Sequence, residues 1–239
     1  MRRLVVLLAV ALLILGTAAP ATARSMSFYR STYYSLQFDW IQLDRDAAGD
    51  RLPPMDSRPF GNVHIGFGFA QEFGSGQAWI FGQIADLNCP VDFIPSPGGG
   101  HGIALEEEPP VDPENPCTHI GFRSIQGTVP LSIDNKLTRA VLGGPGETVG
   151  IFGGGDPHGG GGDLLANVPI NVTFTGVGPL TKFTFTESFT DGTFTYSSRY
   201  SSNQRAAELT GVLGPMGFDP DLSGGFMSYN REVSRSRSR

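Results

Sequence analysis

The chain has 239 residues, with 17 basic and 23 acidic side chains and a formal net charge of −6. Nucleic-acid binding needs a basic face that displaces counterions from phosphates, so this acidic balance argues against a nucleic-acid partner. The 33 glycines and 18 prolines are typical of a chain that turns often.

Residues 1–23 have the three regions of a cleavable signal peptide. Arg2 and Arg3 form a positive start, Leu4 to Leu15 is an unbroken apolar run, and Ala21 to Ala23 supplies small residues before the cleavage site. The alternative is an uncleaved anchor, but the apolar run is shorter than the roughly 20 residues that span a bilayer. We therefore predict a secreted protein, extracellular or in the cell envelope, with no transmembrane segment after cleavage.

Cleavage leaves a β-rich domain over residues 24–233 and a basic tail over residues 234–239. It removes two arginines and no acids, which moves the formal charge from −6 to −8. The tail alternates serine with arginine, a low-complexity pattern that predicts disorder, and its functional alternative is adhesion to an anionic cell surface.

Hydrophobic side chains alternate with polar or small ones along the domain, which predicts β-strands. One hairpin is predicted from Val63 to Phe69 and Ala78 to Ile84, and another around Asp191-Gly192, where two Thr/Phe-rich runs meet. Further alternations lie at 120–122, 129–133, 168–174, 183–189 and 194–196. We predict an all-β fold of about eight to ten strands, a single antiparallel β-barrel or a β-sandwich with long Gly/Pro-rich loops.

Two segments fit a helix as well as a strand. Apolar residues from Leu36 to Ala47 lie on one helical face, although the first of them also alternate. Residues 203–213 begin with an asparagine and precede a glycine, which is typical of a capped short helix. Both assignments stay open.

Cys89 and Cys117 are the two cysteines of the chain. An even pair in an oxidising compartment predicts one disulfide, and neither residue lies in the C-x-x-C spacing of a metal or redox site. The bond would close a loop that includes the acidic run Glu106 to Glu108, and would remove roughly 3 to 4 kcal/mol of unfolded-state entropy.

A second loop, Gly153 to Gly162, consists mostly of glycine. Asp156, His158 and Asp163 lie in it or beside it, and their oxygen and imidazole groups are candidate metal ligands. Ordering a glycine-rich backbone around an ion is entropically costly, so we predict no metal and no other cofactor.

Glu187 is the candidate catalytic residue, because it shares a strand face with three phenylalanines. A carboxylate among apolar side chains is unfavourable unless paired, and such groups gather at functional sites. In a barrel interior Glu187 would face Arg123 or Arg199, as a structural ion pair or as an acid/base. At a strand end or bulge it would reach solvent instead.

Aromatic residues are dense near the mature N-terminus, and Tyr33, Tyr34 and Trp40 are the candidate binding residues there. Exposed aromatic rings stack on sugars and apolar ligands, although aromatic residues of a β protein are more often core.

The absence of a specific catalytic motif favours a secreted, non-enzymatic β domain that binds a small ligand, a glycan or a cell-surface component on its loops. One alternative is a small-molecule enzyme of barrel type that uses Glu187. The other is a structural or adhesive envelope protein. The pattern specifies neither the ligand nor the oligomeric state.

Overall fold

The computed structural model describes residues 26–72, 74–95, 116–153, 162–214, 216–219 and 221–238. The predicted signal peptide, the acidic run and residues 154–161 of the glycine loop lie outside them. The described elements are all strands: β1 (Met26–Leu43), β2 (Val63–Glu72), β3 (Gln77–Asn88), β4 (Thr118–Ile133), β5 (Arg139–Gly153), β6 (Asp163–Asp191), β7 (Phe194–Leu213), β8 (Met216–Gly217) and β9 (Ser223–Ser238).

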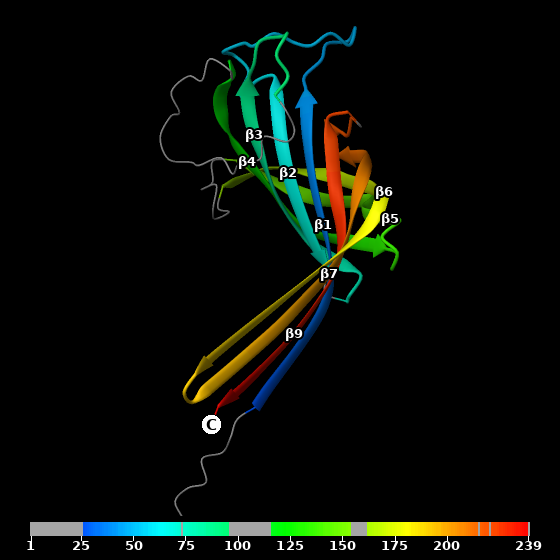
Figure 1. The fold of residues 1–239 in the computed structure, drawn as a ribbon. Helices are drawn as coiled ribbons and strands as arrows, with labels where there is room; N and C mark the ends of the chain where they lie inside the picture. The colour runs from blue at the N-terminus through cyan, green and yellow to red at the C-terminus, as the bar shows by residue number, and fades with distance from the viewer. Residues whose placement is uncertain are drawn as a thin grey trace, which may run out of the picture. The chain divides into compact units, whose positions relative to one another are not determined.

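Eight of these strands form one ring-like antiparallel sheet (Figure 1). The strand order is β6-β5-β4-β3-β2-β1-β9-β7, pairing between β6 and β7 closes the ring, and the two-residue β8 adds to β7. Most strands pair with their neighbours in sequence, as short turns between antiparallel strands allow. The predicted all-β, antiparallel fold is confirmed.

Both predicted hairpins are present. Strands β2 and β3 pair from Val63 with Leu87 to Glu72 with Ala78. The turn between them includes two glycines with positive φ, 85° and 74°, a conformation that other residues adopt rarely. In the second hairpin β6 continues through Asp191, so the turn consists of Gly192 and Thr193 rather than being centred on Asp191-Gly192.

Neither of the two segments that fitted either element is a helix. Residues 36–43 belong to β1 and residues 203–213 to β7. In β1 the side chains of Leu36, Phe38 and Trp40 are all buried. They are two residues apart, which is the spacing of side chains on one face of a β-strand. Residues 234–238, for which the sequence predicts disorder, extend strand β9.

The chain divides into two compact units, which are described separately. Among the described residues, unit 1 contains 26–30, 185–199 and 232–238, and unit 2 contains the rest. Strands β1, β6, β7 and β9 contribute residues to both units.

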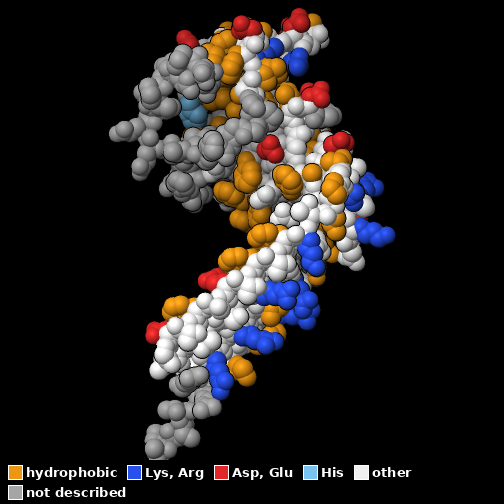
Figure 2. Space-filling model, viewed as in Figure 1, with side chains coloured by type: hydrophobic (Ala, Val, Ile, Leu, Met, Phe, Trp, Pro, Cys, Tyr) orange, Lys and Arg blue, Asp and Glu red, His pale blue; other side chains and the backbone are white. Residues whose placement is uncertain are grey.

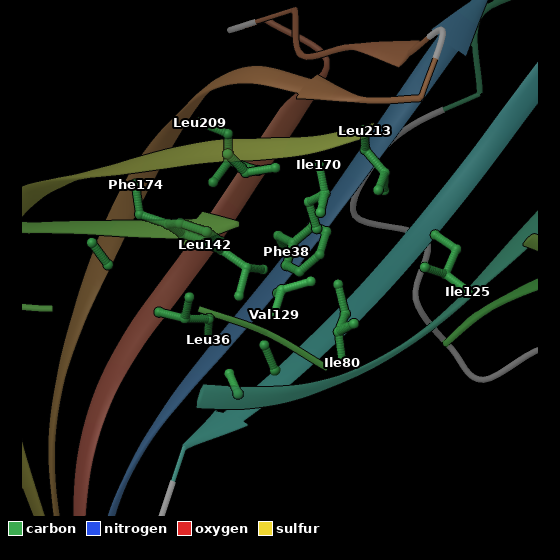
Figure 3. Packing of buried hydrophobic residues seen from close by; sticks show 14 of the residues in the cluster. Leu36, Phe38, Ile80, Ile125, Val129, Leu142, Ile170, Phe174, Leu209 and Leu213 are labelled. Carbon is green, nitrogen blue, oxygen red and sulfur yellow. The ribbon is translucent and has the colours of Figure 1, made fainter. Parts of the chain in front are cut away.

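Unit 2 has a packed apolar interior (Figure 3). Leu36, Ile80, Ile125 and Phe174 come from four different strands and are fully buried together. The Phe38 ring lies 5.7 Å from the Phe174 ring. The space inside the ring of strands is therefore filled by side chains.

Two glycines of β2 leave room for two large rings of β1. A Cβ atom at Gly66 would lie 2.0 Å from Cζ2 of Trp40, and one at Gly68 would lie 2.2 Å from Cζ of Phe38. Trp40 and Phe38 stack at 5.6 Å between centroids. The rings thus occupy the volume that any larger residue at these glycines would need.

We predict that Gly66→Ala destabilises the protein by about 1–3 kcal/mol, because the new methyl group overlaps the Trp40 indole. The measurement is urea unfolding followed by far-UV circular dichroism. Gly121→Ala is the matched control, since a Cβ there meets nothing within 4 Å, and it should change stability by less than about 0.5 kcal/mol. Equal effects of the two substitutions would contradict the packing argument.

Candidate functional site

Glu187 lies on β6 with its side chain exposed. Arg123, one of the two arginines expected to face it, bonds Asp86 instead. The burial that the enzyme hypothesis needs at Glu187 is absent, because the β6 segment around this residue has no buried side chain.

The three predicted binding aromatics do not form an exposed platform. Trp40 is 1% exposed, and its ring packs against Phe38 and Phe218, so it belongs to the core. Tyr33 and Tyr34 are half-buried. The Tyr34 hydroxyl donates to Oδ1 of Asn135 at 2.6 Å, and burial, followed by nearby charges, raises the pKa of Tyr34. Strand β1 turns alternate side chains into the ring, which explains the burial of Trp40.

The structure describes one of the three metal candidates. Asp156 and His158 lie outside the described residues, and Asp163 is an exposed residue at the start of β6. In the described ranges, no group of three or more His, Cys, Asp or Glu side chains is arranged to hold a metal ion.

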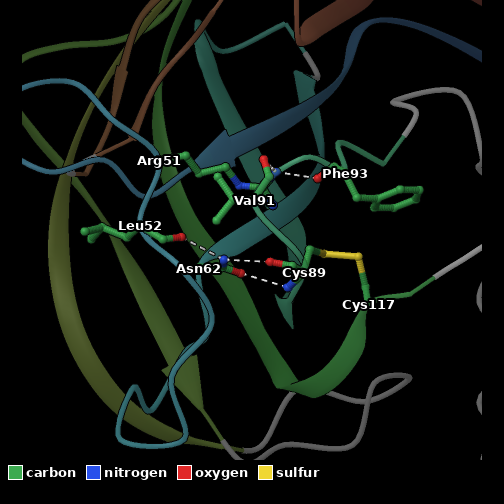
Figure 4. The surroundings of a disulfide bond; sticks show 7 residues. All are labelled: Arg51, Leu52, Asn62, Cys89, Val91, Phe93 and Cys117. Carbon is green, nitrogen blue, oxygen red and sulfur yellow. Dashed lines mark hydrogen bonds between the residues drawn. A yellow bond between two sulfur atoms is a disulfide. The ribbon is translucent and has the colours of Figure 1, made fainter.

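The predicted disulfide joins Cys89 to Cys117 (Figure 4). The buried side chain of Asn62 fastens this end of β3: its Nδ2 donates to the carbonyls of Leu52 and Cys89, and its Oδ1 accepts from the Cys89 amide, each at 2.9 Å. Arg51 donates from Nη1 to the carbonyls of Val91 and Phe93. The disulfide thus lies among side-chain hydrogen bonds that join the segments at this end of unit 2.

A hollow of about 510 Å³ lies beside this disulfide. Four prolines, two of them next to the cysteines, and the side chains of Asp56 and Arg58 line it. The remaining lining residues are Asn88, Thr118 and Ile120. The hollow offers two opposite charges and no aromatic ring.

A cluster of charged side chains is buried between the ends of β2, β3 and β4. Asp86, 1% exposed, accepts from Nε of Arg123 at 2.8 Å and from its Nη2 at 2.5 Å. His64 Nδ1 lies 2.8 Å from the same carboxylate, and Nε2 lies 3.3 Å from Oδ1 of Asp44. The Arg123 guanidinium also covers the Phe60 ring at 4.5 Å.

An aspartate that orients a histidine is an arrangement found in acid/base catalysis. Here both nitrogens of His64 face carboxylates, and Arg123 is bound in a bidentate manner. Nearby His119 has its pKa lowered by burial, an effect that the charge of Asp86 partly offsets. The cluster satisfies its own charges, and we interpret it as structural.

We predict that Arg123→Met destabilises the protein by about 3–5 kcal/mol, because it leaves the Asp86 carboxylate buried without its main cation. Chemical unfolding at neutral pH measures the change. The control is Asp44→Asn, since this carboxylate is partly exposed and more distant from its partner; its effect should stay below about 1 kcal/mol. A small effect of Arg123→Met would refute the structural role.

The exposed aromatic surface lies on the outside of β2 and β3. We call Phe67, Phe69, Trp79 and Phe81 the outer aromatic face. Phe69 pairs with Phe81 across the two strands, and the Trp79 and Phe81 rings are 11° from parallel with centroids 5.9 Å apart. Trp79 is 50% exposed and Phe67 is 45% exposed. Figure 2 shows hydrophobic side chains on the surface where β2, β3 and β4 lie.

Carboxamides border this face. Cross-strand partners project to the same side of a sheet, and the partners of the four aromatic residues include Gln71, Gln83, Gln37 and Gln126. Asp39 pairs with Phe67, and burial raises the pKa of this aspartate against the opposing effect of a backbone hydrogen bond. Lysine and arginine do not occur among these partners.

Neither the charge cluster nor the outer aromatic face is predicted by the sequence pattern. The alternation from Val63 to Phe69 separates two sides of β2 without saying which is inward. The structure buries His64 and both glycines, and turns the phenylalanines outward.

No protein-family model matches the chain, and neither a curated protein nor a solved structure matches it. A helix that could cross a membrane is not found in the part of the chain that the structure describes. A functional interpretation therefore relies on the geometry of the described residues.

Proposed function

We propose that the mature chain is an exported, non-enzymatic β domain that binds a neutral glycan on the outer aromatic face. The observation that carries this proposal is the pair of nearly parallel rings of Trp79 and Phe81 within a border of carboxamides. The disulfide is compatible with an oxidising, extracytoplasmic compartment.

The chemistry of the face matches that of a sugar chain. The C–H faces of pyranose rings are apolar and stack on aromatic rings, and glutamine side chains both donate to and accept from sugar hydroxyls. Covering about 100 Å² of ring surface would contribute roughly 2.5 kcal/mol. A face without lysine or arginine offers no attraction to an anionic polymer, which favours a neutral ligand over an acidic one.

The residues that an enzyme would use do not support the enzyme alternative. Glu187 is exposed, and the histidine and arginine of the buried cluster are engaged by carboxylates. A binding role needs none of these groups, because an exposed aromatic patch on a sheet can itself contact a ligand.

We predict that Trp79→Ala weakens binding to a neutral polysaccharide by about 5- to 150-fold, as expected when one stacking ring worth about 1–3 kcal/mol is lost. The mature protein would be screened on an array of neutral and acidic polysaccharides, and the affinity for the best ligand measured by calorimetry.

Phe183→Ala is the matched control, since Phe183 is also 50% exposed and belongs to unit 2. It should bind as the wild type does. The proposal fails if the wild type binds no neutral glycan, or if the Trp79 and Phe183 variants bind equally well.

A further inference from the structure

Unit 1 is a sheet without a core. Its segments come from β1, β9, β7 and β6, which are neighbours in this order, and none of its described residues is buried. Phe28 is 60% exposed, Phe185 51% and Phe189 55%. A sheet gains stability by packing a face against another layer, and within the described residues neither face of unit 1 has such a layer over its aromatic side chains.

Two contacts define the faces on β1 and β9. Cζ of Arg235 lies 5.5 Å from the centre of the Phe28 ring, so these two side chains share one face. The hydroxyls of Ser27 and Ser236 lie 2.6 Å apart, and these side chains share the opposite face. Alternation along each strand then places Arg30 and Arg237 with Arg235, and Glu232 with Ser236.

Two contacts in unit 2 extend the assignment to β7 and β6. The Tyr200 hydroxyl donates to Oδ1 of Asn230 at 2.5 Å, which puts the even-numbered residues of β7 on the side of Ser236. Arg199 therefore shares the face of Arg235. The Phe183 ring lies 6.5 Å from the Tyr200 ring, so Glu187, on the same side of β6 as Phe183, lies opposite to the arginines.

The two faces of unit 1 thus carry opposite charges. One, the basic face, has Arg30, Arg199, Arg235 and Arg237 and no acid among the described residues. The other, the acidic face, has Glu187, Asp191 and Glu232 and no base among them, together with most of the aromatic rings. Figure 2 shows Lys and Arg side chains gathered along the strand ends that form unit 1.

We propose that the basic face of one copy stacks on the acidic face of a second copy. Two basic faces or two acidic faces would repel each other, whereas unlike faces attract and bring arginines onto aromatic rings. Sheets that stack in this way lie about 10 Å apart. The contact joins two different surfaces and leaves one of each free, so it can propagate from copy to copy.

The test uses the mature chain with two paired substitutions. Arg235→Ser with Arg237→Ser weakens the basic face, and Glu187→Gln with Glu232→Gln weakens the acidic face. Sedimentation velocity should show the wild type associating beyond a dimer at low salt and dissociating at high salt. Each variant alone should self-associate at least tenfold more weakly.

The decisive experiment is to mix the two variants. Each retains the face that the other has lost, so an equimolar mixture should form 1:1 complexes that grow no further. Lys136→Ser with Arg139→Ser is the matched control, because it removes two exposed positive charges from unit 2. This control should associate as the wild type does, and near-UV circular dichroism verifies that every variant is folded.

Three results would overturn the proposal: a wild type that stays monomeric at low salt, folded face variants that associate normally, or a mixture that does not recombine. Vesicles of anionic and neutral lipid provide a further arm. A monomeric wild type that binds only the anionic vesicles would assign the basic face to a membrane surface and exclude stacking. None of these outcomes depends on glycan binding by unit 2.

Discussion

The interior of unit 2 depends on the fit between two aromatic rings and two glycines. Trp40 and Phe38 of β1 fill the volume opposite Gly66 and Gly68 of β2. Since β2 must present its smallest residues to the core, its phenylalanines lie on the outside. The outer aromatic face therefore follows from a packing requirement on the other side of the same strand, and a change of register by one residue would abolish both.

The end of the ring at the disulfide is stabilised in a different way. Asp86, Arg123 and His64 place charge at this end, where a smaller apolar cluster that includes Val63 and Cys89 is also buried, and the bonds among the charged groups satisfy them. The Asn62 side chain and the disulfide hold the end of β3 at Cys89 to the segments before β2 and β4. Such clusters contribute less to stability than apolar packing does, but they penalise any arrangement that separates their members.

Local pattern was enough to predict the strand-rich fold and the two hairpins, because turns and alternation are properties of short segments. The disulfide could be predicted because a chain with two cysteines allows a single pairing. Which side of a strand faces inward is not a local property. The burial of Trp40 and the exposure of Phe67 are decided by residues on neighbouring strands. Glu187 shares a face with phenylalanines, as predicted, but that face is exposed, since alternation cannot tell a covered sheet from an uncovered one.

The closure of the ring has a consequence for biogenesis. Neighbouring strands from β1 to β6 can pair as soon as each emerges, whereas β1 finds its other partner only in β9. This contact between the first and last strands has the greatest sequence separation in the sheet, and such contacts form late. In the export that we propose, a chain entering the oxidising compartment from its N-terminus would build an open meander during translocation and complete its fold only after the last strand has crossed.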